Sequence, residues 1–369
     1  MKKIIAAGHV CLDITPVFPA DRQFHEFSEL LIPGRLLHTR AADIHTGGSV
    51  ANTGLALKKL GCDVSLLGKV GNDAFGGIIR NIFADYGVSG LLTDASGSTS
   101  YSVVLAIPGI DRVFLHNPGA NDTFSAADIP EDALRDTALF HFGYPPLMKR
   151  MYENDGDELI SLFRRVHESG IATSLDLAAV DAASEAGQAD WVQILSGVLP
   201  FVDFFVPSFE ELCWMLDRPL YDRLSSAGGD ITAQLDLKNE VLPLAQQLID
   251  MGCRVALIKC GVSGMVYCTS DRRSLTTVGH RLDLDIDAWS TRSGCQPCFR
   301  ADAVRSATGA GDTSIAAFLA AVLAGKSPAE CTALAAAEGA CCVTEYDALS
   351  GLKSLSELEA RIHAGWATM

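Results

Sequence analysis

The sequence predicts an α/β fold in which helices cover both faces of a doubly wound, mostly parallel sheet, giving three layers and a small β-sheet lid. Apolar strand-like segments alternate with amphipathic helix-like segments along most of the chain, and this alternation is typical of parallel sheets. Residues 14–45 and 97–122 interrupt it with Pro, Gly and β-prone residues that lack a helical period. We expect these two insertions to pair into the lid, although long insertions often form plain surface loops.

The first strand is expected at residues 3–12. Two lysines before this apolar stretch imitate a secretory signal, but His9 and Asp13 interrupt it too early for a signal core. Further strands are expected at residues 64–67, 101–107, 138–142, 172–177, 202–206 and 254–259. Helices are expected at residues 49–60, 75–86, 157–169, 208–216 and 240–251. The predicted organisation is therefore an α/β core at residues 1–13, 46–96 and 123–369, with the lid at residues 14–45 and 97–122.

The charge and the cysteine content of the chain indicate which partners and which cellular compartment to expect. The 369 residues include 45 acidic and 29 basic side chains, for a net charge of -16. Such a surface repels nucleic acid and anionic membranes, so we expect neither as a partner. Eleven cysteines without a regular spacing favour free thiols in a reducing, cytoplasmic environment. Cys295 and Cys298 form a single CxxC, which lacks the two further ligands of a zinc site, and their role is left open.

The strongest chemical signal is RSATGAGDTSIAAFLAAVLAGKS at residues 305–327. Its apolar residues recur at helical spacing from Ile315 to Val322, which predicts a buried helix that begins just after Gly311. Gly309, Ala310 and Gly311 then form a loop with little side chain at the helix N-terminus. Free N–H groups and the positive end of the helix dipole meet there, so the loop is predicted to be an anion hole for a phosphoryl group.

Asp312 lies at the edge of this predicted anion hole. A carboxylate there suits a base that orients an attacking hydroxyl and accepts its proton during phosphoryl transfer. The alternative is an ordinary capping aspartate after a tight glycine turn. The GKS at residues 325–327 is no P-loop, because residue 320 is Ala and the triplet follows a helix. No GxGxxG follows the first strand, so a dinucleotide-binding dehydrogenase is unsupported.

A second signal is HTGGSVAN at residues 45–52. Gly47 and Gly48 allow close approach of the backbone to a ligand before a helix, and Asn52 offers a donor and an acceptor for hydroxyl groups. Asp13 adds an acceptor at the end of the first strand, where open α/β sheets place ligands. These four residues are the predicted substrate site.

The two glycine motifs, GGSVAN and ATGAGD, separated by an alternating α/β body, resemble the ribokinase-like carbohydrate kinases, also called the PfkB family. GKVGNDAFG at residues 68–76, PSFEE at residues 207–211 and the GxxG of Gly261 to Gly264 occur in the family's order. The resemblance covers essentially the whole chain, and the two glycine motifs together are specific.

The resemblance implies a ribokinase-like fold, ATP as the phosphoryl donor with Mg²⁺, and a small sugar-like substrate. It assigns Asp312 as the catalytic base and the preceding glycine loop as the anion hole. Glu211 matches the glutamate of an Asn-x-x-Glu motif that organises magnesium and phosphate through water, so no direct metal ligand is implied. The loop from Gly261 to Gly264 resembles part of the adenine-nucleotide site.

The chain departs from the family pattern at two positions. Ser306 stands where the family often has an Asp that helps to hold a monovalent cation, which leaves potassium dependence open. Ser208 replaces the Asn of the Asn-x-x-Glu motif, keeping a hydroxyl but losing an amide donor. Neither change removes the predicted base or the anion hole.

The predicted function is ATP-dependent phosphorylation of a hydroxyl on a small sugar or sugar-like substrate. A nucleoside kinase on the same fold would need an aromatic slot, for which the candidates are Phe18, Phe24, Phe27 and Tyr101. A kinase of phosphorylated sugars would need cations, for which the candidates are Arg35, Arg40 and Arg112. A non-catalytic ligand-binding relative is the third possibility. Lid strands with exposed edges would also allow a homodimer.

Overall fold

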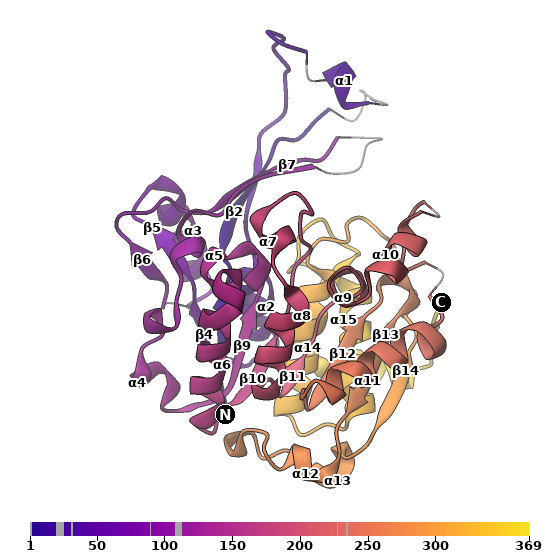
Figure 1. Ribbon diagram of the computed structural model, residues 1–369. Helices are drawn as coiled ribbons and strands as arrows, with labels where there is room; N and C mark the ends of the chain where they lie inside the picture. Colours follow the sequence, from indigo (N-terminus) through magenta and orange to yellow (C-terminus); the bar gives the residue numbers. More distant parts are fainter. Residues whose placement is uncertain are drawn as a thin grey trace.

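The structure is a computed structural model that describes residues 2–19, 26–30, 32–88, 90–107, 113–226, 228–233 and 235–369. Figure 1 shows a layered body with helices on both sides of a central sheet, from which an extended segment carrying β2 and β7 projects. The N-terminal third of the chain, at the indigo end of the colour bar, contributes strands and helices to the body and also forms the projecting segment.

The central sheet has eight strands in the order β14–β13–β12–β11–β10–β9–β1–β4. The six strands from β12 to β4 are parallel to their neighbours, whereas β13 and β14 are antiparallel at one edge. The mostly parallel sheet predicted from the sequence is confirmed. The strands are β1 (Lys3–Gly8), β4 (Asp63–Leu67), β9 (Thr137–Gly143), β10 (Ala172–Leu175), β11 (Phe204–Phe205), β12 (Val255–Lys259), β13 (Met265–Thr269) and β14 (Ser293–Gln296).

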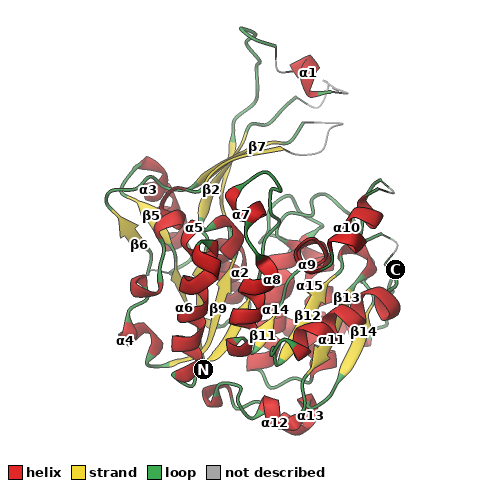
Figure 2. Cartoon of the chain, in the orientation of Figure 1, coloured by secondary structure: helices red, strands yellow, loops and turns green. Residues whose placement is uncertain are grey.

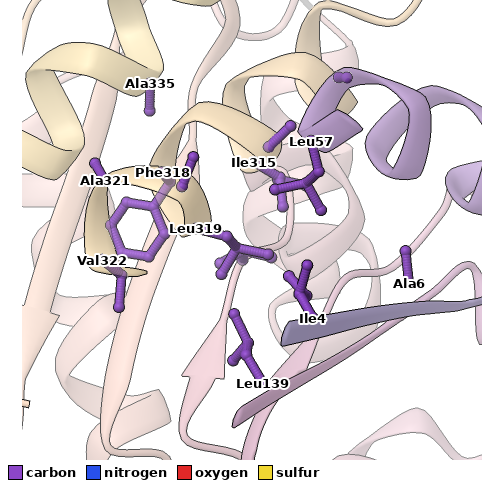
Figure 3. Packing of buried hydrophobic residues seen from close by; sticks show 14 of the residues in the cluster. Ile4, Ala6, Leu57, Leu139, Ile315, Phe318, Leu319, Ala321, Val322 and Ala335 are labelled. Carbon is purple, nitrogen blue, oxygen red and sulfur yellow. The ribbon is translucent and has the colours of Figure 1, made fainter. Parts of the chain in front are cut away.

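Alternation along β1 divides the core between the two faces of the sheet. Ile4 and Ala6 join one cluster, and Ile5 and Ala7 join the other, because successive side chains of a strand point to opposite faces. Figure 3 shows Ile4 and Leu139 facing Ile315, Leu319 and their neighbours on the first side. That face is covered by α2 (Ser49–Lys59), α3 (Ala74–Asp85), α14 (Ala310–Leu323), α15 (Pro328–Cys342) and α16 (Leu355–His363).

The opposite face of the sheet is covered by α6 (Asp157–Glu168), α8 (Trp191–Val198), α9 (Phe209–Leu216) and α11 (Leu242–Asp250). α6 has the strongest amphipathic pattern among these helices, with Leu159, Leu162, Phe163 and Val166 buried at the spacing of one helical face. In the part of the chain that the structure describes, no helix combines the length and hydropathy needed to cross a membrane.

Shorter elements connect these layers. The short helices are α1 (Phe27–Leu30), α4 (Glu131–Leu134), α5 (Lys149–Tyr152), α7 (Glu185–Gln188), α10 (Arg218–Ser225), α12 (Arg272–Leu275) and α13 (Ile286–Trp289). A two-stranded sheet pairs β5 (Lys69–Gly71) with β6 (Leu92–Asp94). A π-helical turn at Leu237–Val241 leads into α11, and 3₁₀ turns include Pro145–Leu147 and Gly261–Ser263.

A second sheet, called the lid sheet below, has four strands in the order β3–β2–β7–β8. They are β2 (Cys11–Thr15), β3 (Asp43–Gly47), β7 (Tyr101–Leu105) and β8 (Val113–Asn117). Figure 2 shows these strands rising from the body and ending in long loops. The lid sheet thus unites segments from both predicted insertions.

The predicted single strand at residues 3–12 is wrong, because the chain changes sheets within it. The His9 N–H donates to the Gly143 carbonyl at 3.2 Å, and the Leu12 N–H donates to the Ser100 carbonyl at 3.0 Å. β1 therefore ends in the central sheet and β2 begins in the lid sheet. The predicted boundary between core and lid after residue 13 falls inside β2, and the predicted boundary before residue 46 falls inside β3. Each strand continues across its boundary without a break.

Candidate active site

Gly309 begins α14 in a left-handed conformation, with φ 77° and ψ -2°. A Cβ at this position would lie 2.2 Å from the Ala348 Cβ, so the turn admits no side chain without a shift of its neighbour. Ala310, Gly311 and Asp312 form the first turn that follows. The first N–H groups of a helix lack partners within the helix and carry its positive dipole end, so this turn can bind an anion.

Asp312 is almost fully buried, with 4% of its surface exposed. Its Oδ2 accepts a hydrogen bond from Asn52 Nδ2 at 3.0 Å, and its Oδ1 accepts one from Thr53 Oγ1 at 3.2 Å. The Tyr144 hydroxyl lies 2.9 Å and 2.8 Å from the two carboxylate oxygens. Because α14 is capped by Gly309 and the Asp312 oxygens accept from these other elements, the alternative of a capping aspartate is wrong.

A cavity of about 650 Å³ opens beside this carboxylate. Its lining brings together eight of the residues predicted from the sequence, namely Ser208, Glu211, Gly261, Gly264, Gly309, Ala310, Gly311 and Asp312. They come from the ends of β11 and β12 and from the start of α14, which meet at the carboxyl edge of the sheet. Clefts at this edge are the usual ligand sites of open α/β sheets, and the volume suits a nucleotide-sized ligand.

The predicted substrate residues lie on another side of Asp312. Asn52 reaches the carboxylate directly, whereas Asp13, Gly47 and Gly48 are absent from the lining of the cavity. Asp13 lies on β2 opposite His45 of β3, and a Cβ at Gly47 would come within 2.2 Å of its Oδ2. Burial raises the pKa of Asp13, although hydrogen bonds from Cys11 and Ser102 oppose the shift. The structure therefore separates a cavity side from a lid side, with Asp312 between them.

Two charged residues of the cavity were missed by the sequence analysis. Lys259, the last residue of β12, forms a buried ion pair with Asp176, with 2.8 Å between Nζ and Oδ1. The Lys259 Nζ lies 3.7 Å from the point that a Cβ on Gly311 would occupy. The signal for both residues was their place at the ends of predicted strands, where an ionisable side chain is unusual unless it is paired.

The ion pair gives the cavity a fixed cation in an otherwise acidic protein. Burial lowers the pKa of Lys259, but the nearby carboxylates of Asp176 and Glu211 outweigh it and raise that pKa. Burial also raises the pKa of Asp176, with Glu211 and Asp312 adding to the shift and Lys259 opposing it. Lys259 therefore stays protonated next to the glycine loop, where a transferring phosphoryl group would need positive charge.

Tyr144 was also missed, because no motif marks it. It follows β9 with a left-handed φ of 68°, which is uncommon outside glycine, and its ring is directed to Asp312 by this turn. Burial, followed by the charges of Asp312 and Asp176, raises the pKa of Tyr144 well above its usual value. The hydroxyl is therefore protonated at neutral pH and donates to the carboxylate.

Ser208 and Glu211 form a capping box at the start of α9. The Ser208 N–H donates to Glu211 Oε2 at 2.8 Å, and the Glu211 N–H donates to Ser208 Oγ at 3.3 Å. Ser208 thus caps α9 through its hydroxyl, one of the preferred N-cap groups. The Glu211 carboxylate lines the cavity from the same helix start.

The described residues proposed for other substrate classes make contacts with residues other than Asp312. Phe18 and Phe27 pack with Ile107 in the projecting segment, whereas Tyr101 lies edge-on to Phe75 with ring centroids 5.4 Å apart. Arg35 and Arg40 are exposed, and Arg35 donates to the Glu29 carbonyl at 2.9 Å. Phe24 and Arg112 lie outside the described residues.

The sequence leaves open the roles of three further residues, Ser306, Cys295 and Cys298. Ser306 Oγ accepts a hydrogen bond from the Thr308 N–H at 3.1 Å. Cys298 lines the cavity and Cys295 lies on β14, both as free thiols. Within the described ranges, no cluster of three or more His, Cys, Asp or Glu residues is arranged to hold a metal ion.

Comparison with known proteins agrees with this geometry. The family model described as pfkB family carbohydrate kinase matches residues 2–355. A sugar kinase of Archaeoglobus fulgidus, itself uncharacterised, is 26% identical over 302 residues, which is 81% of this chain and 98% of the relative. Fructokinase-1 of Oryza sativa is 32% identical over 101 residues, covering 26% of this chain and 31% of that protein.

The same fold occurs in solved structures. The ribokinase of Arabidopsis thaliana, solved with ribose and ATP, superposes with a TM-score of 0.70 at 19% identity and covers 98% of each chain. This likeness confirms the ribokinase-like fold that the two glycine motifs predicted. With a family model that spans nearly its whole length, the chain belongs to the pfkB family of carbohydrate kinases.

Proposed function

We propose that this kinase transfers the γ-phosphoryl group of ATP to a hydroxyl of a small sugar or sugar-like molecule, with Asp312 as the base and the Gly309–Gly311 turn as the anion hole. The observation that carries the proposal is the place of Asp312: a buried carboxylate in the first turn of α14, between the cavity and the lid side.

The hydrogen bonds of Asp312 leave room for a substrate hydroxyl. A carboxylate offers about four lone-pair positions. Asn52, Thr53 and Tyr144 supply three donors, because the single Tyr144 proton serves one oxygen at a time. The remaining position can accept the proton of a hydroxyl as its oxygen bonds to the γ-phosphorus and the bond to the β-phosphate oxygen breaks, which releases ADP.

The cavity accounts for the donor substrate. Gly261 and Gly264 line it together with the Gly309–Gly311 turn, so a nucleotide bound there would contact both loops. Lys259 supplies positive charge at the second loop. The carboxylates of Glu211 and Asp176 also line the cavity. Their oxygens are the kind of ligand that Mg²⁺ prefers, either directly or through its bound waters. When bound, Mg²⁺ would neutralise charge on the phosphates.

The lid side accounts for the acceptor substrate. Asp13, Gly47, Gly48 and Asn52 lie near the joint between the lid sheet and the body, and a relative of the same fold was solved with ribose. Together with the fructokinase relative, this supports a neutral pentose or hexose as the first compounds to test. A nucleoside is less well supported, since the described aromatic candidates lie in two separate places.

The experiment is an assay of ADP formation with ATP and Mg²⁺, with and without potassium, on D-fructose, D-ribose, D-gluconate, sugar phosphates and nucleosides. We expect turnover on one class that is lost in Asp312→Asn while ATP binding persists. Turnover that survives in Asp312→Asn would contradict the role of the base. Silence across the panel with ATP bound would contradict the proposed reaction and favour a ligand-binding relative.

Association through the lid sheet and a cytoplasmic location stay predictions. The outer strand β8 exposes Val113, Phe114 and Leu115 along a free edge, with 56% of Phe114 accessible, and such edges favour pairing with a second copy. Light scattering after gel filtration measures this directly, and a stable monomer at assay concentration would contradict the dimer.

A further inference from the structure

His9 is a buried side chain that the proposed reaction does not use. It joins β1 to β2, and 1% of its surface is exposed. Its carbonyl accepts a hydrogen bond from the Val50 N–H at 3.1 Å, and its Nδ1 lies 2.6 Å from the point that a Cβ on Gly48 would occupy. Backbone bonds thus fix this ring against the glycine pair of the proposed substrate site.

Neither ring nitrogen of His9 has a hydrogen-bond partner among the residues that the structure describes. A buried polar atom left unpaired costs about 1–3 kcal/mol, so such a group in a folded protein calls for an explanation. A neutral imidazole carries one N–H donor and one acceptor nitrogen. That pair of groups matches two hydroxyls of a polyol.

The neighbours of His9 place its ring on the lid side of Asp312. The ring centroid lies 5.3 Å from that of His116 on β8 and 6.1 Å from that of Tyr144. Tyr144 in turn donates to Asp312, and His116 Nδ1 lies 3.0 Å from Ser102 Oγ on β7. His9 does not line the cavity assigned to the nucleotide. It therefore lies between the lid sheet and the proposed base.

The charge around this position disfavours an anionic substrate. The carboxylates of Asp13 and Asp312 lie on the lid side, whereas the described contacts of His9, Asp13 and Asn52 include neither Lys nor Arg. Lys259 is paired with Asp176 on the cavity side. Burial, assisted by the nearby His116, lowers the pKa of His9 to about 3, so its ring is uncharged at neutral pH. A phosphate or carboxylate here would meet negative charge, and the described contacts at this position offer it no Lys or Arg.

We propose that His9, bordered by His116 of the lid sheet, is a specificity-determining residue that hydrogen-bonds hydroxyls of a neutral polyol and excludes phosphorylated and carboxylated sugars. The inference rests on the proposed function, because it assigns the acceptor class of that same site. Since the ring is buried in this arrangement, the substrate enters before the lid sheet brings His116 against His9.

Kinetics on paired compounds test the inference. D-fructose is compared with D-fructose 1-phosphate, D-ribose with D-ribose 5-phosphate, and D-glucose with D-gluconate. We expect the neutral member of the active pair to have a kcat/KM at least about tenfold higher, which corresponds to about 1.4 kcal/mol. A higher value for the charged member would overturn the inference and leave the kinase reaction intact. If no pair gives turnover although ATP binds, the result would contradict both this inference and the proposed kinase reaction.

Variants separate binding from structure. His9→Leu removes both polar atoms, whereas His9→Asn keeps a donor and an acceptor. We expect His9→Leu to raise the sugar KM about tenfold with kcat and the ATP KM nearly unchanged, and His9→Asn to restore most of the loss. His363→Leu, on an exposed helix end, is the matched control. If His9→Leu changes the sugar KM less than twofold, or if His9→Asn fails to restore it, the specificity role is refuted.

His116→Leu guards against a folding defect at His9. His116 is exposed on β8, so its replacement does not open a core. We expect it to raise the sugar KM by a smaller factor than His9→Leu, because His116 borders the site and already pairs with Ser102. An unchanged KM for His116→Leu, combined with an unfolded His9→Leu, would count against the inference.

Discussion

Two helices on the same face of the sheet, α2 and α14, both begin at a glycine, and they begin differently. Gly48 precedes α2 with φ 85° and ψ 164°, and the first turn of α2 holds no acidic residue. Gly309 precedes α14 with φ 77° and ψ -2°, and Asp312 lies in its first turn. The helices pack against each other, and Asn52 and Thr53 near the start of α2 donate to the carboxylate of Asp312.

In the proposed reaction, this difference would let two similar helix N-termini bind different substrates. Both N-termini offer N–H groups and a positive dipole end. At α14 the nearby Lys259 adds charge suited to phosphate, whereas at α2 the neighbours are His9 and Asp13, which suit hydroxyls. Asn52 and Thr53 of α2 then donate hydrogen bonds to Asp312 of α14, which connects the proposed acceptor side to the proposed base.

Among the substitutions that test this comparison, Gly309→Ala is expected to have the largest effect, a fall in kcat. A Cβ there would lie 2.2 Å from the Ala348 Cβ, and a left-handed φ costs an L-residue about 1–2 kcal/mol. Displacing the turn misplaces N–H donors aimed at developing charge, and losing one such donor typically lowers kcat about 10²–10³-fold. We expect a fall in kcat of this order with a sugar KM that changes little, measured by steady-state kinetics.

Gly77→Ala is the matched control for that variant. Gly77 lies within α3, and a Cβ there would meet nothing within 4 Å. Its kcat should equal that of the wild type. If Gly309→Ala also keeps its kcat while it remains folded by circular dichroism, the turn is no anion hole.

Gly48→Ala is expected to have a smaller effect, and to change the sugar KM. Its φ and ψ lie in a region that is essentially restricted to glycine, and holding an alanine there costs about 1–3 kcal/mol. The added Cβ would also approach the His9 carbonyl oxygen to 2.5 Å. We expect the sugar KM to rise about tenfold while the ATP KM stays the same. A rise in the ATP KM instead would show that the two N-termini are not assigned to separate substrates.

The smallest effect is expected from Tyr144→Phe. The ring still fills its space, but the donor to Asp312 is lost. Since two other donors remain on the carboxylate, we expect kcat to fall about threefold to tenfold, in keeping with about 1 kcal/mol for a typical hydrogen bond. Tyr86→Phe, an exposed tyrosine directly after α3, is the control. An unchanged kcat would show that Tyr144 does not position Asp312.

Much of the fold followed from the sequence because local signals were strong. The helices α2, α3, α6 and α9 lie within one or two residues of their predicted positions, since their apolar faces and caps are local features. The division of residues 3–12 between two sheets was missed, because both halves are apolar and buried and only distant partners separate them. The antiparallel strands β13 and β14 also depend on such partners.

The site was predictable where a backbone motif carries it. Glycines before a helix mark Gly48 and Gly309 in the sequence, and the structure places eight predicted residues on one cavity. Lys259, Asp176 and Tyr144 were missed, since single side chains at strand ends acquire meaning only when the sheet brings them together. The roles assigned to the predicted residues stay predictions.

The central claim is that Asp312 is the base of phosphoryl transfer, and a single-turnover experiment tests it most directly. Enzyme in excess over radiolabelled ATP, mixed with a saturating sugar acceptor, reports the chemical step free of product release. We expect Asp312→Asn to lower this rate about 10²–10⁴-fold, the usual contribution of a general base, while the Kd for ATP changes little. A single-turnover rate in Asp312→Asn within about threefold of the wild-type rate would contradict it.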